Sequence, residues 1–301
     1  MTQIGHFPYY SKSFKRDKNP KRMLFQLLRV RQWYKNTLIF LPLVFAGLIT
    51  DISSVVLSVI GFVALCLMSS TNYIVNDIVD RDKDKIHPEK CQRPIAAGKI
   101  SISAATTIAM VCATLALILA FVLAQQFFVI LLIFFGLTQV YSLFLKNEVF
   151  LDIIAISTNF VLRAVSGVFL LDVRLSPWLI ICPFFLGLFI ASGKRYADIS
   201  LLKEKSHEHK KVLAQYSPEI ARTLIILSTA LLILSYSLYS FLSVYPHLIY
   251  TIPIALYLIL RYYYLIESHS PIARHPEHCY KDKRLVAGII AWTIAVFILI
   301  Y

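Results

Sequence analysis

The stretch VVLSVIGFVALCLMSSTNYIVNDIVDRDKD, residues 55–84, passes from a long apolar run directly into four aspartates within eight positions. A helix of about 20 predominantly apolar residues is long enough to cross the ~30 Å hydrocarbon core of a bilayer. The stretch therefore predicts a membrane-spanning helix that ends in a cluster of carboxylates. The remainder of the chain repeats the apolar half of this pattern.

Apolar runs of similar length recur along the 301 residues, 58% of which are hydrophobic. The alternating segments of about ten residues that are typical of membrane β-barrels do not occur. We therefore expect an all-α, polytopic membrane protein with about nine transmembrane helices around a central cavity that opens to the cytoplasm. The expected spans are 38–50 (extended backward to Met23), 54–75, 102–124, 127–145, 150–171, 177–193, 222–243, 246–266 and 285–301.

Basic residues are concentrated in segments that nine alternating spans place on one side of the membrane. These segments, which together hold 28 of the 30 Lys and Arg residues, are 1–35, 81–99, 146–149, 194–222 and 261–284. The positive-inside rule assigns this side to the cytoplasm, so the N-terminus lies inside the cell membrane and the C-terminus outside. The net charge of +13 is thus an orientation signal, and nucleic acid is not expected as a partner.

Two parts are expected in the chain: a basic cytoplasmic tail at residues 1–22 and a single transmembrane domain at 23–301. The loops on the far side are short, so a chemically active face would be the cytoplasmic one. Five cysteines without a CxxC spacing argue against a disulfide framework and against a zinc site. Solvated loop positions are expected for His207, His209, His269, His275 and His278.

Helical periodicity divides the four aspartates into two sets. If the helix continues to about residue 85, Asp77, Asp80 and Asp84 fall within about 60° of arc, and Asp82 points the opposite way. Tyr73 lies one turn deeper on the same face. Neighbouring carboxylates repel one another unless a cation lies between them, and Mg²⁺ commonly binds one or two carboxylates together with substrate phosphates. The face therefore predicts a site for Mg²⁺ and a diphosphate; the alternative is a solvated acidic helix end.

The segment QRPIAAGKIS, residues 92–101, follows the acidic helix. Its proline breaks the helix, Gly98 suits a turn, and Ser101 or Ser103 is suited to cap the next helix. Arg93 either reaches a substrate phosphate or serves only as a topogenic charge.

The order N-D-x-x-D-x-x-x-D followed by R-P-I-x-x-G resembles the first aspartate-rich motif of the UbiA superfamily of intramembrane prenyltransferases. LLRVRQWYKN (27–36) resembles the entry to that family's first helix, and YSLFLKNEVFLDI (141–153) resembles its fourth-to-fifth helix connection. The resemblance implies that Asp77, Asp80 and Asp84 hold Mg²⁺. Substrate contacts are implied at Lys35, Tyr73, Asn76, Arg93, Tyr141 and Lys146.

The second aspartate-rich motif of that family is altered here. The equivalent stretch, ASGKRYADISLLKEKSHEHKKVLAQYS (191–217), holds one aspartate, Asp198, followed by Glu204 and Glu208. It presents the adjacent cations Lys194 and Arg195 instead, which suggests an additional anion to bind.

That departure resembles one branch of the superfamily, the decaprenyl-phosphate phosphoribosyltransferases. S-G-K-R-Y-A-D and LRAVSG (162–167) are similar to motifs of this branch, whose donor is 5-phosphoribosyl 1-diphosphate and whose acceptor is a polyprenyl phosphate. The resemblance implies catalytic, phosphate-binding roles for Lys194, Arg195 and Tyr196 beside Asp77 and Asp80. Asp198 would complete the metal shell or orient the two cations. Plain positive-inside charge is the alternative for the cations.

Arg163 lies about 20 Å into its span at ~1.5 Å per residue. An ionised residue at that depth is costly and usually faces a polar cavity or a charged partner. Asn159 lies one turn earlier on the same face. We expect both residues to contact substrate in the central cavity; an ion pair that ties two helices together is the alternative for Arg163.

Together these features predict Mg²⁺-dependent transfer of a 5-phosphoribosyl group from 5-phosphoribosyl 1-diphosphate to a polyprenyl phosphate, with release of diphosphate. Transfer of a prenyl group from prenyl diphosphate to an aromatic acceptor is the alternative, although the second acidic motif is poor. An ion or phosphate transporter is a remote third, because transporters favour broken helices or paired repeats at mid-membrane. The sequence leaves a homo-oligomer open.

Overall fold

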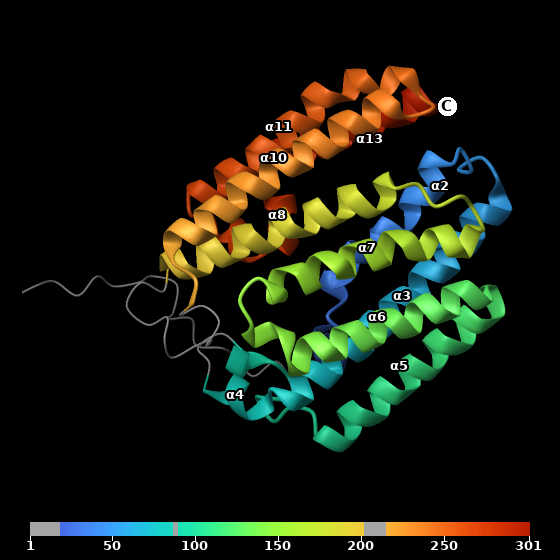
Figure 1. Ribbon diagram of the computed structural model, residues 1–301. Helices are drawn as coiled ribbons and strands as arrows, with labels where there is room; N and C mark the ends of the chain where they lie inside the picture. Colours follow the sequence, from blue (N-terminus) through green and yellow to red (C-terminus); the bar gives the residue numbers. More distant parts are fainter. Residues whose placement is uncertain (1–18, 87–89, 202–214) are drawn as a thin grey trace, which may run out of the picture.

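Figure 1 shows a computed structural model of the chain, which describes residues 19–86, 90–201 and 215–301 as helices and their connections. Eight segments of this described part are long and apolar enough to cross a membrane. They are α3 (Ile52–Val79), α5 (Ile102–Leu123), α6 (Gln125–Leu143), α7 (Leu151–Leu171), α8 (Trp178–Leu201), α10 (Pro218–Leu242), η5 with α11 (Pro246–Thr251 and Ile252–Glu267) and α13 (Lys283–Ile300). The expected all-α, polytopic class is confirmed.

The first expected span is not one helix, so the predicted number of nine is only approximate. Its residues form α1 (Pro20–Leu27), the 3₁₀ helix η1 (Val30–Phe40) and α2 (Leu41–Phe45). The backbone is left-handed at Arg29 (φ 49°), which interrupts the helix between α1 and η1. Polar side chains give the physical reason, because Asn36 of η1 is 1% exposed and bonds with groups on α3 and α7 rather than facing lipid.

The acidic end of α3 also differs from the expected continuous helix to about residue 85. α3 ends at Val79, Asp80 adopts a non-helical conformation (φ −89°, ψ 4°), and the short helix α4 (Arg81–Lys85) follows. The downstream expectations are confirmed at two positions. Gly98 is left-handed (φ 67°), and the Ser101 hydroxyl caps α5 by accepting from the backbone N–H of Ala104 at 3.2 Å.

Several connections that the sequence assigns to the cytoplasmic side gather at one end of the bundle. In Figure 1, α4, the connection from α6 to α7 and the start of α10 lie at the left, whereas α2 and the C-terminus lie at the right. The short elements that join the long helices are η2 (Lys90–Gln92), η3 (Leu145–Asn147), α12 (Pro271–Arg274) and η6 (Pro276–Lys281).

The centre of the bundle is α7. In its most apolar 18-residue stretch, 67% of the residues are buried inside the protein, compared with 11% in α13. The polar residues of α7 therefore face other helices rather than lipid. Gly167 permits a close approach between α7 and η1, because an added Cβ would meet the backbone carbonyl of Ile39. This contact holds η1, with Lys35 and Asn36, against the middle of the membrane domain.

Candidate functional site

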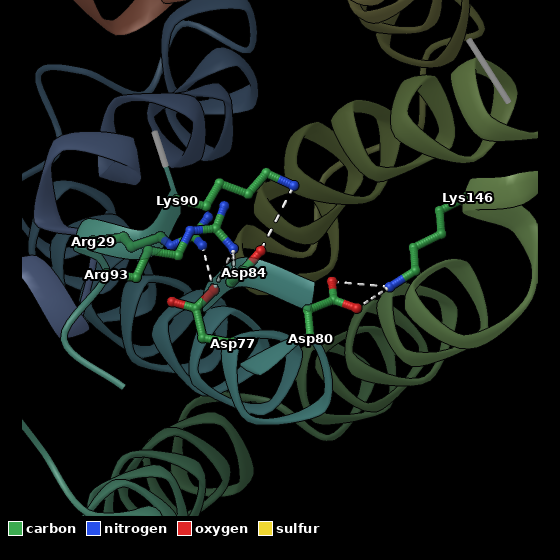
Figure 2. Close-up of polar contacts among 7 residues, drawn as sticks. All are labelled: Arg29, Asp77, Asp80, Asp84, Lys90, Arg93 and Lys146. Carbon is green, nitrogen blue, oxygen red and sulfur yellow. Dashed lines mark hydrogen bonds and ion pairs between the residues drawn. The ribbon is translucent and has the colours of Figure 1, made fainter. Parts of the chain in front are cut away.

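Two aspartates, Asp77 near the end of α3 and Asp84 in α4, share a cluster of cations (Figure 2). Asp77 Oδ1 accepts hydrogen bonds from Arg29 at 2.5 Å and from Arg93 at 3.0 Å. The same guanidinium nitrogen of Arg93 donates to Asp84 Oδ2 at 2.6 Å, and Lys90 lies 3.8 Å from the other oxygen of Asp84. Both carboxylate side chains are 3% exposed, so these contacts compensate charges that have left water.

Asp80 takes a different direction. Both of its oxygens accept from the Lys146 ammonium, at 2.7 and 2.9 Å, across from η3, and Figure 2 shows this pair turned away from Asp77 and Asp84. Asp80 lies at the turn between α3 and α4, within reach of the Lys146 ammonium of η3, and helical periodicity does not contain this long-range contact. Asp82, expected to face water, pairs with Lys85 at the surface.

These contacts decide how the three carboxylates relate to a metal. In the part of the chain that the structure describes, no group of three or more His, Cys, Asp or Glu side chains is placed to hold an ion. The donor set still suits Mg²⁺, which needs only one or two carboxylates when substrate phosphates complete its shell. Asp77 and Asp84 lie together, and Asp77 Oδ2 accepts no hydrogen bond from the described residues. The residues therefore fit an ion that arrives with a phosphate ligand.

Charge gives the site a second property. The cluster holds the four cations of Arg29, Lys90, Arg93 and Lys146 against the three carboxylates of Asp77, Asp80 and Asp84, a surplus of one positive charge. Each carboxylate is thus already paired with a cation that could transfer to a phosphate. Of these cations, sequence reasoning missed Arg29 and Lys90; Arg29 stands within the quoted LLRVRQWYKN stretch, but no spacing rule relates it to an aspartate 48 residues away.

Outside the membrane spans, the pKa of Lys90 is lowered, first by its burial and then by the nearby Arg93 cation. Asp84 and Asp80 act in the opposite direction by favouring the charged ammonium. A lysine crowded in this way binds an incoming anion readily, because the anion relieves the repulsion between the cations.

The second motif lies along the end of α8, and its residues point to different partners. Arg195 Nε donates to Asp152 Oδ2 at 2.7 Å, with both side chains buried. Tyr216 donates to the other oxygen of Asp152 at 2.8 Å. The Tyr141 side chain of α6 lies within electrostatic range of Arg195. Asp152 is therefore the residue that fixes Arg195. Glu204, Glu208, His207 and His209 lie outside the described residues.

One alternative for Asp198 was to orient Lys194 and Arg195, but Asp198 makes no direct bond with Arg195. It accepts from Arg274 of α12 at 2.9 Å and lies within electrostatic range of Lys194. Tyr196 stacks on the ring of His269, with 6.3 Å between centroids. The loop from α11 to α13 is thus attached to the motif at two points.

Glu277 of η6 is an acidic residue that sequence reasoning did not single out. Burial raises its pKa, but hydrogen bonds from His275 and Gln32 and the Lys194 cation outweigh burial and lower the pKa to about 2. Glu277 therefore carries a full negative charge beside Lys194. Lys194 is solvent-accessible and has Lys35, Arg195 and two carboxylates as electrostatic neighbours, which places it in an accessible polar space.

Arg163 is buried, 7% exposed, in the middle of α7. Its Nε donates to Asn36 Oδ1 and one terminal nitrogen donates to the backbone carbonyl of Asn159, both at 2.8 Å. Its guanidinium carbon lies 4.8 Å from the Phe134 ring centroid. No carboxylate of the described residues lies within ion-pair distance, so the expected alternative of an interhelical ion pair is wrong there. Asn159 is occupied by Thr138 and its own helix backbone.

Tyr73 joins these groups. Its ring lies under the Arg29 guanidinium at 4.7 Å, and its hydroxyl is within electrostatic range of Lys35, Arg163 and Lys194. The side chain of Asn76 makes no hydrogen bond with the described residues, while its backbone carbonyl accepts from the Asp80 N–H at 2.9 Å. The two aspartate-rich and cation-rich motifs thus meet across one polar interior.

Residues 37–276 match the model of the UbiA prenyltransferase family. The chain belongs to this family. Family membership places it among membrane-embedded transferases and confirms the resemblance drawn from the first motif.

Named proteins show which UbiA-family members this chain resembles. It is 30% identical over 290 residues to the decaprenyl-phosphate phosphoribosyltransferase of Mycolicibacterium smegmatis, covering 91% of each chain. It is 31% identical over 234 residues to the enzyme of the same name from Corynebacterium glutamicum, covering 75% of this chain and 70% of that one. The fold resembles a UbiA homolog from Archaeoglobus fulgidus bound to GPP and Mg²⁺, with a TM-score of 0.69, 20% identity and coverage of 91% and 99%.

Proposed function

We propose that the chain is a Mg²⁺-dependent phosphoribosyltransferase of the cell membrane, which transfers a 5-phosphoribosyl group from 5-phosphoribosyl 1-diphosphate to a polyprenyl phosphate and releases diphosphate. One observation carries the proposal: the second motif presents Lys194, Arg195 and Tyr196 where a second acidic metal site would require aspartates. Relatives at about 30% identity that bear the phosphoribosyltransferase name support the same choice.

The first motif would receive the donor diphosphate. Asp77 and Asp84 would hold Mg²⁺, with Asp80 as a third ligand once Lys146 leaves it. When bound, the ion would neutralise the charge that develops on the departing diphosphate. Arg29, Arg93 and Lys146 now lie on carboxylate oxygens and would transfer to diphosphate oxygens, so that metal and phosphate exchange partners within one cluster.

The second motif would position one of the two remaining phosphate groups. Lys194 is accessible and would contact a phosphate directly, beside the Tyr196 hydroxyl. Arg195 is held on Asp152, and from there it would fix the end of α8 and contribute positive potential. The lipid phosphate is already an anion and needs little help from a base, so the protein's contribution is placement of the two reactants. Asn76, Asn159 and Asp198 remain proposed substrate-site residues.

The orientation belongs to the same proposal. With 28 of 30 basic residues on one side, the N-terminus and the site would face the cytoplasm, where a water-soluble donor is available. The polyprenyl tail would enter sideways from the bilayer between helices. This arrangement accounts for a polar reaction at the surface of a membrane domain.

The experiment is incubation of the purified protein with Mg²⁺, radiolabelled 5-phosphoribosyl 1-diphosphate and a polyprenyl phosphate. The expected result is a labelled lipid, and its absence alongside prenylation of an aromatic acid from prenyl diphosphate would replace this function by the alternative. A second test compares Asp77→Asn and Asp80→Asn with Asp82→Asn, a surface aspartate outside the site. Turnover should fall only in the first two, and turnover retained when both are combined would remove the metal assignment.

A further inference from the structure

A second group of cations lies deeper than the carboxylate cluster, on the other side of Tyr73. The Tyr73 ring contacts Arg29 of the carboxylate cluster, while its hydroxyl lies within electrostatic range of Lys35 and Arg163. Lys35 comes from η1 and Arg163 from the centre of α7, the most buried helix. The two cations therefore face one polar interior from two elements.

Neither cation is neutralised by a carboxylate in the part of the chain that the structure describes. Arg93, Arg195 and Arg274 each have a carboxylate within 3.0 Å, whereas Arg163 has an amide oxygen, a backbone carbonyl and aromatic faces. Lys35 lies over its neighbour's ring, with its ammonium 5.8 Å from the Tyr34 centroid. Two buried or half-buried cations without a counter-charge are costly in a membrane interior, and a bound anion removes that cost.

Tyr34 supplies an independent sign of a missing ligand. Its hydroxyl is buried and finds no hydrogen-bond partner among the described residues. It lies within electrostatic range of Tyr73 and of Arg163, so it belongs to the same space. A buried hydroxyl that is left unpaired costs about 1–3 kcal/mol, which makes an unpaired donor beside two uncompensated cations a feature of a binding site rather than of a core.

We infer that Lys35, Arg163 and the Tyr34 hydroxyl form a second anion site that binds a phosphate monoester, separate from the carboxylate cluster that receives the diphosphate. The inference rests on the proposed function, in which two phosphate monoesters take part: the 5-phosphate of the donor and the phosphate of the lipid acceptor. Neither is a diphosphate with a bound metal, and both carry up to two negative charges. Two cations and a hydroxyl match that charge and supply donors for several oxygens.

The negative groups nearby do not occupy this site. Glu277 interacts with Lys194 and lies near Tyr34, and Asp77 is bound by Arg29 and Arg93. Glu277 borders the site on the side of the second motif, and Asp77 borders it on the side of the first. An incoming monoester would therefore be held away from them, between the two motifs, where a reacting group must lie.

Arg163 also supports the fold by bonding with Asn36, so its removal alone would not separate binding from stability. The decisive variants are Lys35→Gln and Tyr34→Phe, which remove a charge and a hydroxyl that bond with no described residue. Arg163→Lys keeps the charge as a conservative comparison. The matched control is Arg31→Gln, which removes an exposed cation of the same helix η1.

The full-length protein in detergent is titrated without Mg²⁺ with two probes, ribose 5-phosphate and a polyprenyl phosphate. Binding of one probe should weaken roughly tenfold or more in Lys35→Gln and Tyr34→Phe. Mg²⁺-dependent binding of inorganic diphosphate and the control's affinities should stay unchanged. The weakened probe identifies the source of the monoester.

Unchanged affinity for both probes in variants that keep the wild-type melting temperature would overturn the inference, as would an equal loss of diphosphate binding. Failure of wild-type protein to bind either probe would do the same. These outcomes are independent of turnover, so loss of the proposed function alone would appear as binding without transfer.

Discussion

Arg93→Gln probes the shared cation of the carboxylate cluster. The Arg93 guanidinium lies 3.0 Å from Asp77 Oδ1 and 2.6 Å from Asp84 Oδ2, and the two carboxylates are 3% exposed. Removing one partner of a fully buried ion pair costs ~3–5 kcal/mol. Arg93 is 23% exposed, and Arg29 and Lys90 remain, so we expect a loss of about 2 kcal/mol. In a chain of this size that corresponds to about 4 °C in melting temperature.

The same substitution, which should destabilise the fold, should strengthen the binding of Mg²⁺. Arg93 and Mg²⁺ compete for the same oxygens, so without diphosphate the variant should bind Mg²⁺ more tightly, by about tenfold if ~1.4 kcal/mol of that competition is removed. Binding of diphosphate in the presence of Mg²⁺ should weaken, because a phosphate ligand is lost.

Two assays follow these effects: thermal unfolding in detergent and calorimetric titration of Mg²⁺ with and without diphosphate. The control is Lys85→Gln, which breaks the exposed Asp82–Lys85 pair and should change neither quantity measurably. The reasoning is refuted if Arg93→Gln melts with the wild type and its affinity for Mg²⁺ is unchanged or lower.

Three further changes test the surrounding framework. Asp152→Asn removes the partner of buried Arg195 and should destabilise the protein by ~3–5 kcal/mol; a melting temperature within 1–2 °C (roughly) of wild type would contradict this. Gly167→Ala meets a backbone carbonyl of η1 and should lower both stability and activity, whereas Gly136→Ala, with open space around its Cβ, should be neutral or stabilising by about 0.5–1 kcal/mol. Glu277→Gln removes a carboxylate whose pKa is lowered from 4.5 to about 2, so its stabilisation is complete above pH 4.5 and disappears as the pH falls towards 2. The free energy of unfolding of the variant should therefore depend less on pH between 4.5 and about 2 than that of the wild type. The same pH dependence in both proteins would argue against the assignment.

Much of the fold was accessible from the sequence because lipid imposes a simple length rule. Apolar runs such as 102–124 and 150–171 need only be long enough to span, and they coincide with α5 and α7 within two residues. The segment from Met23 to residue 50 escaped this rule, since its polar residues turn inward and its backbone breaks at Arg29. Hydropathy cannot distinguish a polar residue that faces a protein interior from one that ends a span.

The sequence predicted which residues make up the candidate site better than it predicted which of them contact one another. Periodicity separated Asp82 from the other aspartates, but it did not show that Asp80, at the turn between α3 and α4, pairs with Lys146. The partners Arg29 and Asp152 lie 48 and 43 positions from the residues they bind, and no local pattern relates such distances. Long-range pairing is a property of the fold, so only the structure supplies it.

The central claim concerns which group is transferred, and a competition between donors tests it most directly. Purified protein receives Mg²⁺, 5-phosphoribosyl 1-diphosphate and a prenyl diphosphate together, with a polyprenyl phosphate and an aromatic acid as acceptors, and the products are weighed by mass spectrometry. We predict a single new lipid, heavier than the polyprenyl phosphate by one phosphoribosyl group, with release of diphosphate. A prenylated aromatic acid and an unmodified polyprenyl phosphate would contradict the account.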